Sequence, residues 1–208
     1  MNLYGEYVDR LSRKYIRKGD RVFDCGCGDG FHTSILKRYS DSVTGGDFSN
    51  RTDPKNGVNF REIKENEYGR ENEFNVVTTF DVIEHVHDDL KFTKELVKIT
   101  QPGGLIIIGT PNRNRLSHKI RALIGKKVTY PYKVGYHFES GGDILHLREY
   151  TIDNLRDLSS KIANVEIVGI MGCFLGLYTT IGPIGLKGLD QKLFAEYTQH
   201  LFLILKKI

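Results

Sequence analysis

Residues 21–30, RVFDCGCGDG, decide the fold, because a short apolar strand there runs into a loop with three glycines. The loop extends from Asp24 to Gly30, and a helical pattern follows it over 31–39. Glycines at alternate positions let a ligand approach the backbone where a Cβ atom would block it. The order of strand, glycine loop and helix predicts the first half of a nucleotide-type βαβ unit. Phe31 occupies the position of the third glycine of the dinucleotide fingerprint, which disfavours a nicotinamide dehydrogenase.

The sequence on either side extends this unit into an open sheet. Four-residue spacing of apolar side chains predicts a helix over 3–16, and further helices are expected over 88–100 and 151–162. The remaining strands are expected at 42–46, 58–63, 74–79, 105–109, 165–170 and 200–205. Strands separated by crossovers predict an α/β fold with a covered parallel sheet, in which the last two strands could pair antiparallel. The stretch 172–188 between those two strands is too apolar for an ordinary linker and too rich in glycine for one helix.

The composition fits one soluble domain. The chain has 208 residues, of which 39% are hydrophobic and 27% charged, so it can bury one core. No apolar run approaches the roughly 20 residues that span a bilayer, and the N-terminal stretch lacks the apolar core of a signal peptide, so we expect a cytoplasmic protein. The three cysteines, Cys25, Cys27 and Cys173, lack zinc-site spacing, which predicts reduced thiols.

Two carboxylates lie where strand ends would meet a ligand. Asp24 comes two residues before the first glycine and suits a cationic ligand such as S-adenosylmethionine (SAM), which carries a sulfonium and an α-amino group. Asp47 ends the next strand about 20 residues after the loop, the separation expected for an acid that binds ribose hydroxyls. The alternative for Asp47 is a turn residue beside Ser49 and Asn50.

Four motifs carry a resemblance to a known family: DCGCGDG at 24–30, GGDFS at 45–49, FNVVTTFDVIEHVHD at 74–88 and PGGLIIIGTPN at 102–112. In order and spacing they resemble class I SAM-dependent methyltransferases. The Glu84-His85 step and HLREYT at 146–151 resemble the small-molecule group that includes the ubiquinone-biosynthesis O-methyltransferases. The resemblance implies a Rossmann-like, seven-stranded sheet with its last strand antiparallel and helices on both faces. It also implies that SAM lies across the carboxyl ends of the strands and that the methyl group moves by in-line displacement.

The resemblance implies the cofactor contacts as well. The glycine loop would hold the methionine part of SAM through Asp24, Gly26, Cys27, Gly28 and Gly30. Asp47 would bind the ribose, with Phe48 beside it, and Phe80 and Asp81 would flank the ligand at the end of the fourth strand.

Two departures from the family pattern concern the adenine end. Lys64 stands where relatives carry an acid for the adenine amino group. The link from Asp47 to Val58 is too short, with Pro54 and Gly57 inside it, to hold the usual full helix. These departures keep open the alternative of a SAM-binding protein without turnover.

Glu84 and His85 are the catalytic candidates, because they follow the fourth strand within reach of a methyl acceptor. A histidine there could take the acceptor proton, since its usual pKa of about 6.5 suits a base at neutral pH. The alternative is a local structural role. A further interpretation treats Asp81, Glu84, His85 and His146 as ligands of a divalent metal, which would resemble the site of small-RNA 2′-O-methyltransferases. Asp81 replaces the Glu of those relatives, and our prediction is a site without a metal.

Residues 112–150 are expected to form a substrate-covering insertion within the single domain 1–208. The bases of its first half follow one another with no acid between them: Arg113, Arg115, Lys119, Arg121, Lys126, Lys127 and Lys133. Its apolar helical face consists of Leu116, Ile120, Leu123 and Ile124. Its aromatic residues are candidates for lining a pocket: Tyr130, Tyr132, Tyr136 and Phe138. The insertion suits a lid over an anionic acceptor; the alternatives are a membrane-surface element, an RNA contact and a solvated basic face.

These observations predict a SAM-dependent methyltransferase that acts on oxygen or another heteroatom of a small or lipid-like acceptor. An RNA 2′-O-methyltransferase with a divalent metal is the alternative enzyme. It is disfavoured because we recognise no appended RNA-binding module and because the net charge is only +4. The sequence does not identify the acceptor, the pathway or the oligomeric state.

Overall fold

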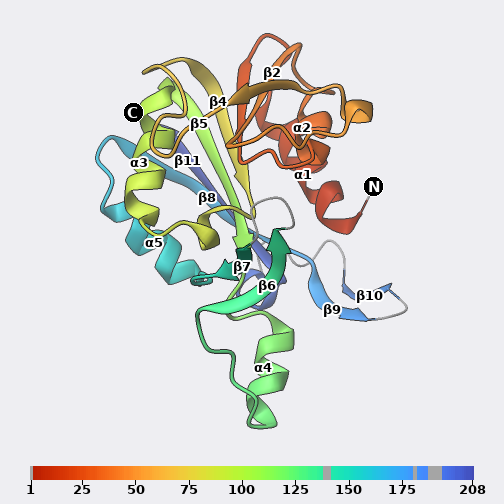
Figure 1. The fold of residues 1–208 in the computed structure, drawn as a ribbon. Coiled ribbons are helices and arrows are strands. Elements are labelled where there is room, and N and C mark those ends of the chain that lie inside the picture. The colour runs from red at the N-terminus through yellow and green to blue at the C-terminus, as the bar shows by residue number, and fades with distance from the viewer. Residues whose placement is uncertain (1, 138–141, 180–181, 187–193) are drawn as a thin grey trace.

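The computed structural model describes residues 2–137, 142–179, 182–186 and 194–208. A seven-stranded sheet runs through the middle of the chain (Figure 1). Its strands are β1 (Arg21–Cys25), β2 (Ser42–Asp47), β3 (Asn59–Glu62), β4 (Phe74–Phe80), β5 (Thr100–Pro111), β8 (Val165–Cys173) and β11 (His200–Lys207). Their order is β3-β2-β1-β4-β5-β11-β8, and β11 runs antiparallel to both of its neighbours. The predicted Rossmann-like sheet with an antiparallel last strand is confirmed.

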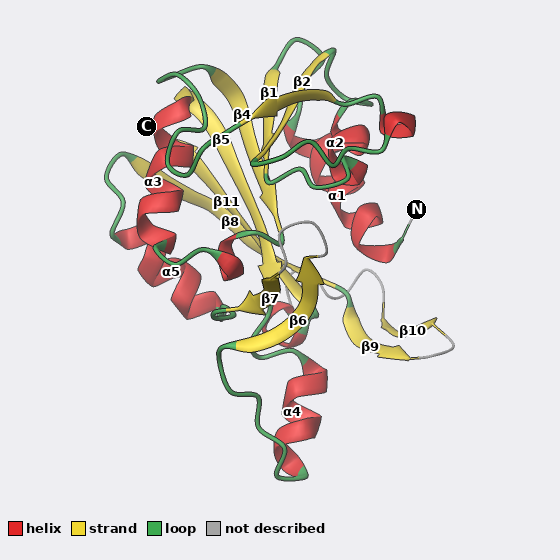
Figure 2. Cartoon of the chain, in the orientation of Figure 1, coloured by secondary structure: helices red, strands yellow, loops and turns green. Residues whose placement is uncertain are grey.

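Two pairs of helices cover the sheet. Helices α1 (Leu3–Tyr15) and α2 (Phe31–Leu36) lie on one face, whereas α3 (Asp89–Ile99) and α5 (Ile152–Ser160) lie on the other (Figure 2). Asn2 caps α1, because its side chain accepts a hydrogen bond of 2.7 Å from the N–H of Gly5. Thr151 and Asn154 form a capping box at the start of α5, which begins within the range predicted for this helix.

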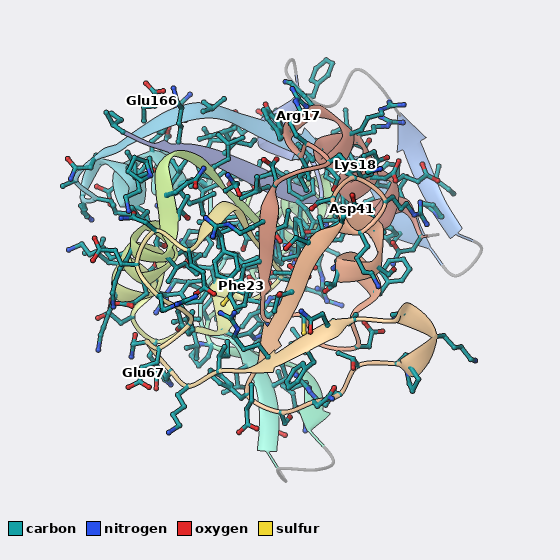
Figure 3. The ribbon with its side chains drawn as sticks, turned by 90° about the horizontal axis from the view of Figure 1, so that it is seen from above. Arg17, Lys18, Phe23, Asp41, Glu67 and Glu166 are labelled. Atoms are coloured by element: carbon teal, nitrogen blue, oxygen red, sulfur yellow. The ribbon has the colours of Figure 1, made fainter. Side chains whose placement is uncertain are left out.

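The core follows the alternation of side chains along the strands. Val22 and Val76 pack with α1 and α2, whereas their chain neighbours Phe23 and Val77 pack with α3 and α5. Successive strand residues point to opposite faces, and both faces are covered here, so the central strands carry apolar side chains on both faces. Figure 3, seen from above, shows Phe23 in the middle of the molecule. The glycine loop therefore starts from a rigid, buried strand.

Some connections match the sequence-based expectation and others differ from it. The link from β2 to β3 holds only a short 3-10 helix, η1 (Pro54–Asn56), as its length predicted. Strand β5 begins at Thr100 rather than at 105 and pairs with β4 across a register shift. Strands β8 and β11 pair antiparallel, as predicted, but β9 (Leu175–Thr179), β10 (Gly182–Leu186) and η3 (Ala195–Tyr197) separate them in sequence. Strands β9 and β10 pair with each other, which the glycine-rich sequence of this stretch did not reveal.

Residues 112–150 follow β5 at the carboxyl ends of the parallel strands. They contain helix α4 (Leu116–Leu123) and the antiparallel pair β6 (Tyr132–His137) and β7 (Gly142–His146). Helix α4 projects away from the sheet, below the arrowheads of β4 and β5 in Figure 1. Of the aromatic residues expected in this segment, Phe138 lies outside the described residues, and only the backbone of Tyr136 is described. Among the described residues, no helix combines the length and the apolar character needed to cross a membrane.

Candidate functional site

The glycine loop turns tightly between β1 and α2. The N–H groups of Gly26 and Cys27 both donate to the carbonyl oxygen of Gly46, at 2.8 and 3.1 Å. Gly26, Gly28 and Gly30 have φ angles of 78°, 53° and 80°, which side-chain-bearing residues rarely adopt. A Cβ atom on Gly26 or Gly30 would collide with a valine, whereas one on Gly28 would meet nothing within 4 Å. Gly28 thus presents its backbone to open space, as contact with a ligand requires.

Asp24 lies beneath this loop as a buried carboxylate. Its Oδ2 accepts a hydrogen bond of 2.6 Å from the Thr33 hydroxyl, and its Oδ1 accepts one of 2.8 Å from the Thr78 hydroxyl. Burial raises the pKa of Asp24 to about 6, against the lowering effect of these two hydrogen bonds. Each carboxylate oxygen thus accepts one hydroxyl, which ties the end of β1 to α2 and β4.

Asp47 joins the end of β2 to the glycine loop. Its Oδ2 accepts hydrogen bonds from the N–H of Gly28 at 2.9 Å and from Arg51 at 3.2 Å, and its Oδ1 accepts one from the N–H of Phe48 at 2.7 Å. The bond to Gly28 connects two signals that lie 19 residues apart in sequence. The bond to Phe48 is a local turn contact, so Asp47 combines a turn role with a position beside the loop. The Phe48 side chain is exposed next to it.

At the expected adenine end, β3 finishes with side chains that face solvent. Glu62 and Lys64 are both exposed, and Lys64 forms an isolated bridge with Glu67. The N–H of Ile63 donates to the Asp47 carbonyl oxygen at 3.0 Å. Main-chain groups next to Asp47, rather than a buried acid, therefore border this end of the loop.

The end of β4 carries a buried polar cluster that sequence reasoning missed in part. Asp81 has a φ of 54° and donates its N–H to the Gly109 carbonyl oxygen at 2.9 Å. Its buried Oδ1 lies 3.8 Å from Nε2 of His200, and burial raises the pKa of Asp81 to about 7. Asp81 Oδ1, the Tyr4 hydroxyl, His32 Nε2 and His200 Nδ1 are all buried without a hydrogen-bond partner in the described part of the chain.

The rings that carry these unpartnered atoms lie next to one another at the strand ends. The ring of Tyr4 lies 4.5 Å from that of His200 and 5.3 Å from that of His32, and Phe80 borders the same cluster at 5.3 Å from His32. Unpartnered buried polar atoms are rare in folded proteins, and several of them together indicate a place for a polar ligand or water. No local pattern marked Tyr4, His32 and His200 because they come from α1, α2 and β11.

Glu84 and His85 lie on a short 3-10 helix, η2 (Ile83–His85), directly after β4. Glu84 is buried, and its Oε2 accepts a hydrogen bond of 3.1 Å from the Thr110 hydroxyl. Its Oε1 has no hydrogen-bond partner among the described residues and lies 4.0 Å from Nε2 of both His85 and His146. Burial, and then the charge of Asp81, raises the pKa of Glu84 well above its usual range.

The second nitrogen of each imidazole fixes its orientation. Nδ1 of His85 lies 2.7 Å from the Leu145 carbonyl oxygen, which can only accept, so this nitrogen donates. Nδ1 of His146 lies 3.1 Å from Oε1 of Glu149, a carboxylate to which it also donates. In the neutral form of each ring the lone pair is then on Nε2, and both Nε2 atoms lie 4.0 Å from Oε1 of Glu84. Such an arrangement suits either a proton acceptor or a metal ion, because metal-binding histidines are commonly oriented by an acceptor on their other ring nitrogen.

Of the four residues that the alternative metal interpretation named, three come together. Ligand atoms of Glu84, His85 and His146 lie within 4.8 Å of one another. Asp81 does not join them and faces His200 instead. One carboxylate and two imidazoles form a donor set that divalent transition metals accept.

Glu149 connects the insertion to this site and was not recognised in the sequence. It is buried and accepts two hydrogen bonds from Arg115, at 2.6 and 2.9 Å, and further bonds from Tyr130 at 2.8 Å and from Tyr132. Burial alone would raise its pKa, but hydrogen bonds from His146 and Arg115 outweigh this effect and lower it to about 2. Arg115 is thereby paired within the insertion. Arg115 therefore no longer belongs to the bases that we expected to face an anionic acceptor.

Comparison with known proteins agrees with the fold and the motifs. A family model described as a methyltransferase domain matches residues 2–160. The ubiquinone biosynthesis O-methyltransferase of Coxiella burnetii is 27% identical over 201 residues, which cover 80% of this chain and 84% of that protein. The protein of the same name from Roseobacter denitrificans is 30% identical over 131 residues, covering 58% of this chain and 52% of that protein.

Solved structures share the architecture at low identity. A SAM-dependent methyltransferase from Methanosarcina mazei superposes with a TM-score of 0.67 at 16% identity, covering 100% of this chain and 99% of that one. The N-methyltransferase NodS from Bradyrhizobium japonicum, in complex with S-adenosyl-L-homocysteine, gives a TM-score of 0.58 at 12% identity, covering 98% and 85%. Identities this low show the fold alone.

Proposed function

Because the chain belongs to the SAM-dependent methyltransferase family, we propose that it transfers the methyl group of SAM to oxygen or another heteroatom of a small or lipid-like acceptor. The observation that carries this proposal concerns Gly28. Its N–H donates directly to Asp47, and a Cβ atom at this glycine would meet only open space. The relatives named for O-methylation in ubiquinone biosynthesis support oxygen as the accepting atom.

We assign the cofactor to the carboxyl ends of β1, β2 and β4. The loop residues Gly26, Cys27, Gly28 and Gly30 would contact the methionine part of SAM, above the charge of Asp24. Asp47 would bind the ribose, with Phe48 alongside, and Phe80 and Asp81 would border the reacting end. The unpartnered atoms around Asp81 support this placement, since a polar, cationic ligand there would supply the missing interactions.

The acceptor would bind next to Glu84 and His85, beneath the insertion 112–150. The Nε2 atom of His85 is the base in this proposal: it takes the acceptor proton while the acceptor atom attacks the SAM methyl group and S-adenosylhomocysteine leaves. The bond from Nδ1 to the Leu145 carbonyl oxygen supports the role, because it leaves the Nε2 lone pair to accept.

A divalent metal is the second candidate for the same three side chains, favoured by the buried, unpartnered Oε1 of Glu84 between two Nε2 atoms. A bound ion would polarise the acceptor oxygen there, held by Glu84, His85 and His146. Metal analysis of the purified protein, with chelation and re-addition, separates the two candidates. Loss of activity on chelation and its return with metal would favour the ion, whereas full activity in a metal-free protein would favour His85 alone.

Substitution of His85 tests the base directly. His85→Gln keeps a donor for Leu145 but removes the base, so kcat should fall by about 10²- to 10⁴-fold while the SAM dissociation constant changes little. His87→Gln, at an exposed histidine two positions on, is the matched control. A His85→Gln enzyme with wild-type kcat would exclude His85 as the base.

The acceptor itself is found by incubating the protein and methyl-labelled SAM with a fractionated cell extract. A labelled small or lipid-like product, absent with Gly28→Val, would support the proposal. Tight SAM binding with no labelled product in any fraction would instead support a SAM-binding protein without turnover.

A further inference from the structure

We propose that the hollow between α1 and the strands β8 and β11 binds an organic phosphate, that is, a phosphate ester with an apolar or aromatic body. One side of α1 lines this hollow together with Met171 and Gly172 of β8 and Phe202 of β11, and we call it the α1 hollow. Its volume of ≈ 400 Å³ is within the range of small-ligand pockets, roughly 300 to 1,000 Å³. The inference concerns this hollow alone and does not depend on methyl transfer.

The floor of the α1 hollow is apolar. Tyr7 and Leu11 of α1 and Phe202 of β11 line it, and all three side chains are buried. Met171 of β8 lines the same floor and is half-buried. Tyr7 and Leu11 are four residues apart, so they lie on the same side of the helix. Such a floor can take the apolar part of a ligand out of water, which favours binding.

The charged lining of the α1 hollow is entirely basic and comprises Arg10, Arg13 and Lys14, all of them exposed. Arg13 and Lys14 lie three and four residues after Arg10, and like charges at this spacing destabilise a helix. Among the described residues, none of the three forms an ion pair, and Asp9 beside them pairs with Arg38 at 3.2 Å. An anion bound in the hollow would offset the repulsion between these bases.

Aromatic rings hold two of the bases in position. The guanidinium carbon of Arg10 lies 5.1 Å from the centroid of the Tyr7 ring, and the ammonium nitrogen of Lys14 lies 4.7 Å from that of the Tyr15 ring. A guanidinium that stacks on a ring face keeps the N–H groups at its edge available as donors. Arginine donates two parallel hydrogen bonds to a phosphate, and lysine adds a point charge. The rim of the hollow is therefore preorganised for a phosphate group.

The α1 hollow lies apart from the strand ends where the cofactor and the acceptor are proposed to bind. Helix α1 leads into the start of β1, so its later turns lie farther from the carboxyl ends of the strands than Tyr4 does. From Tyr4 to Leu11 the helix rises by about 10 Å. The ring of Phe202 stacks on the ring of Tyr4 at a centroid distance of 5.4 Å. These two rings would separate a ligand in the hollow from the Asp81 cluster.

Two other interpretations account for fewer of these observations. A solvated basic helix face explains the exposure of the bases but not the apolar hollow beside them. A nucleic acid strand binds through bases along a track and through exposed rings on which its own bases stack, whereas Tyr7 and Phe202 are buried. A ligand with one compact anionic group and an apolar body satisfies both the floor and the rim.

Isothermal titration calorimetry of the full chain tests the proposal with three probes. Octyl phosphate and ADP represent a lipid-like and a nucleotide source of the organic phosphate, and inorganic phosphate represents the anion alone. At least one organic phosphate should bind about tenfold more tightly than inorganic phosphate or better, since each buried methylene strengthens binding about fourfold. The tighter of the two organic probes identifies the source. Binding should persist with saturating S-adenosylhomocysteine, because the α1 hollow is separate from the proposed cofactor site.

Variants on both sides of the hollow locate the probe. Arg10→Gln/Lys14→Gln should weaken binding of the organic phosphate roughly tenfold or more, the usual effect of removing charged hydrogen bonds. Met171→Glu places an acid on the floor and should abolish measurable binding. The matched control Lys91→Gln/Lys94→Gln removes two exposed bases from α3, on the other face of the sheet, and should bind as wild type. Melting temperatures show whether each variant is folded.

The proposal is overturned if neither organic phosphate binds, if inorganic phosphate binds as tightly as both, or if the variants on α1 and α3 lose affinity equally. Displacement of the probe by S-adenosylhomocysteine would also overturn it, since the probe would then occupy the cofactor site. Binding of a single-stranded RNA oligonucleotide without binding of either organic phosphate would assign the bases to nucleic acid instead. SAM affinity, measured separately for each variant, distinguishes failure of this proposal from failure of the proposed function.

Discussion

Asp24→Asn should stabilise the ligand-free protein and weaken its hold on SAM. The carboxylate is buried between the Thr33 and Thr78 hydroxyls, and burial raises its pKa from 3.8 to about 6. At pH 8 the charged form is therefore disfavoured in the folded state by about 3 kcal/mol relative to the unfolded chain, at about 1.4 kcal/mol for each pKa unit. Asparagine has the same shape and can bond to both hydroxyls without this penalty, so about 3 kcal/mol is the upper limit of the gain.

The direction of the pKa shift of Asp24 determines how the stability difference between variant and wild type changes with pH. A raised folded-state pKa means that the contribution of Asp24 to stability is fully present below about pH 4 and is lost as the pH rises through about 6. The stability difference between Asp24→Asn and wild type should therefore be near zero at pH 4 and reach its limit by pH 8. For a domain of this size, 1 kcal/mol corresponds to roughly 2 to 4 °C in melting temperature.

The assay is urea unfolding at pH 4, 6 and 8, with calorimetric SAM titrations at pH 5 and 7. SAM is cationic and favours ionised Asp24, so wild-type affinity should increase between pH 5 and 7, and Asp24→Asn should not show this increase. Asp41→Asn removes an acid whose side chain is 77% exposed and serves as the control. A stability difference that does not change with pH, or a variant less stable than wild type at pH 8, would refute the reasoning.

Three further predictions concern the loop, the ribose site and the insertion. Gly28→Val should abolish measurable SAM binding in calorimetry, because the φ of 53° at this position disfavours a β-branched residue and the valine side chain would fill the open space. Wild-type affinity in this variant would mean that SAM binds elsewhere. Asp47→Ala should weaken SAM binding by about 1.5 to 3 kcal/mol, and an unchanged affinity with a lowered melting temperature would reduce Asp47 to a turn residue. Glu149→Gln should cost about 3 kcal/mol of stability in urea unfolding, since it leaves the guanidinium of Arg115 without its carboxylate, and a loss below about 1 kcal/mol would contradict the anchoring role.

The Glu149 pair also changes how the lid should be tested. Charge reversal of Arg115 together with Arg113 and Arg121 would break the buried pair and disturb the insertion whatever the acceptor is. Charge reversal at Arg113 and Arg121 alone tests whether the bases of the insertion contribute to acceptor binding. The Arg113 guanidinium carbon lies 5.5 Å from the centroid of the Tyr130 ring, and Arg121 lines a hollow within the insertion. Impaired methyl transfer with unchanged SAM affinity is the expected result, and a wild-type rate would remove these bases from the acceptor site.

The sequence determined the half of the sheet that contains β1, β2 and β3 because its signals are local. The glycine loop follows β1 directly, Asp47 ends the next strand, and the short link through Pro54 excludes a full helix, as the structure has it. Short runs of neighbouring apolar residues in the central strands indicate a sheet that is covered on both faces. Each of these features can be recognised within a few residues of chain.

Tertiary structure alone decided which polar groups meet. Arg115 and Glu149 are 34 residues apart, and the sequence placed Arg115 among the bases of the lid and gave Glu149 no role of its own, yet they form one buried pair. Tyr4 and His200 lie almost at opposite ends of the chain, and only the strand order β4-β5-β11, with α1 on its face, brings their rings to 4.5 Å. Periodicity reports which face of an element is apolar, but a hydrogen-bond partner is chosen by three-dimensional proximity, and a linear pattern does not contain that information.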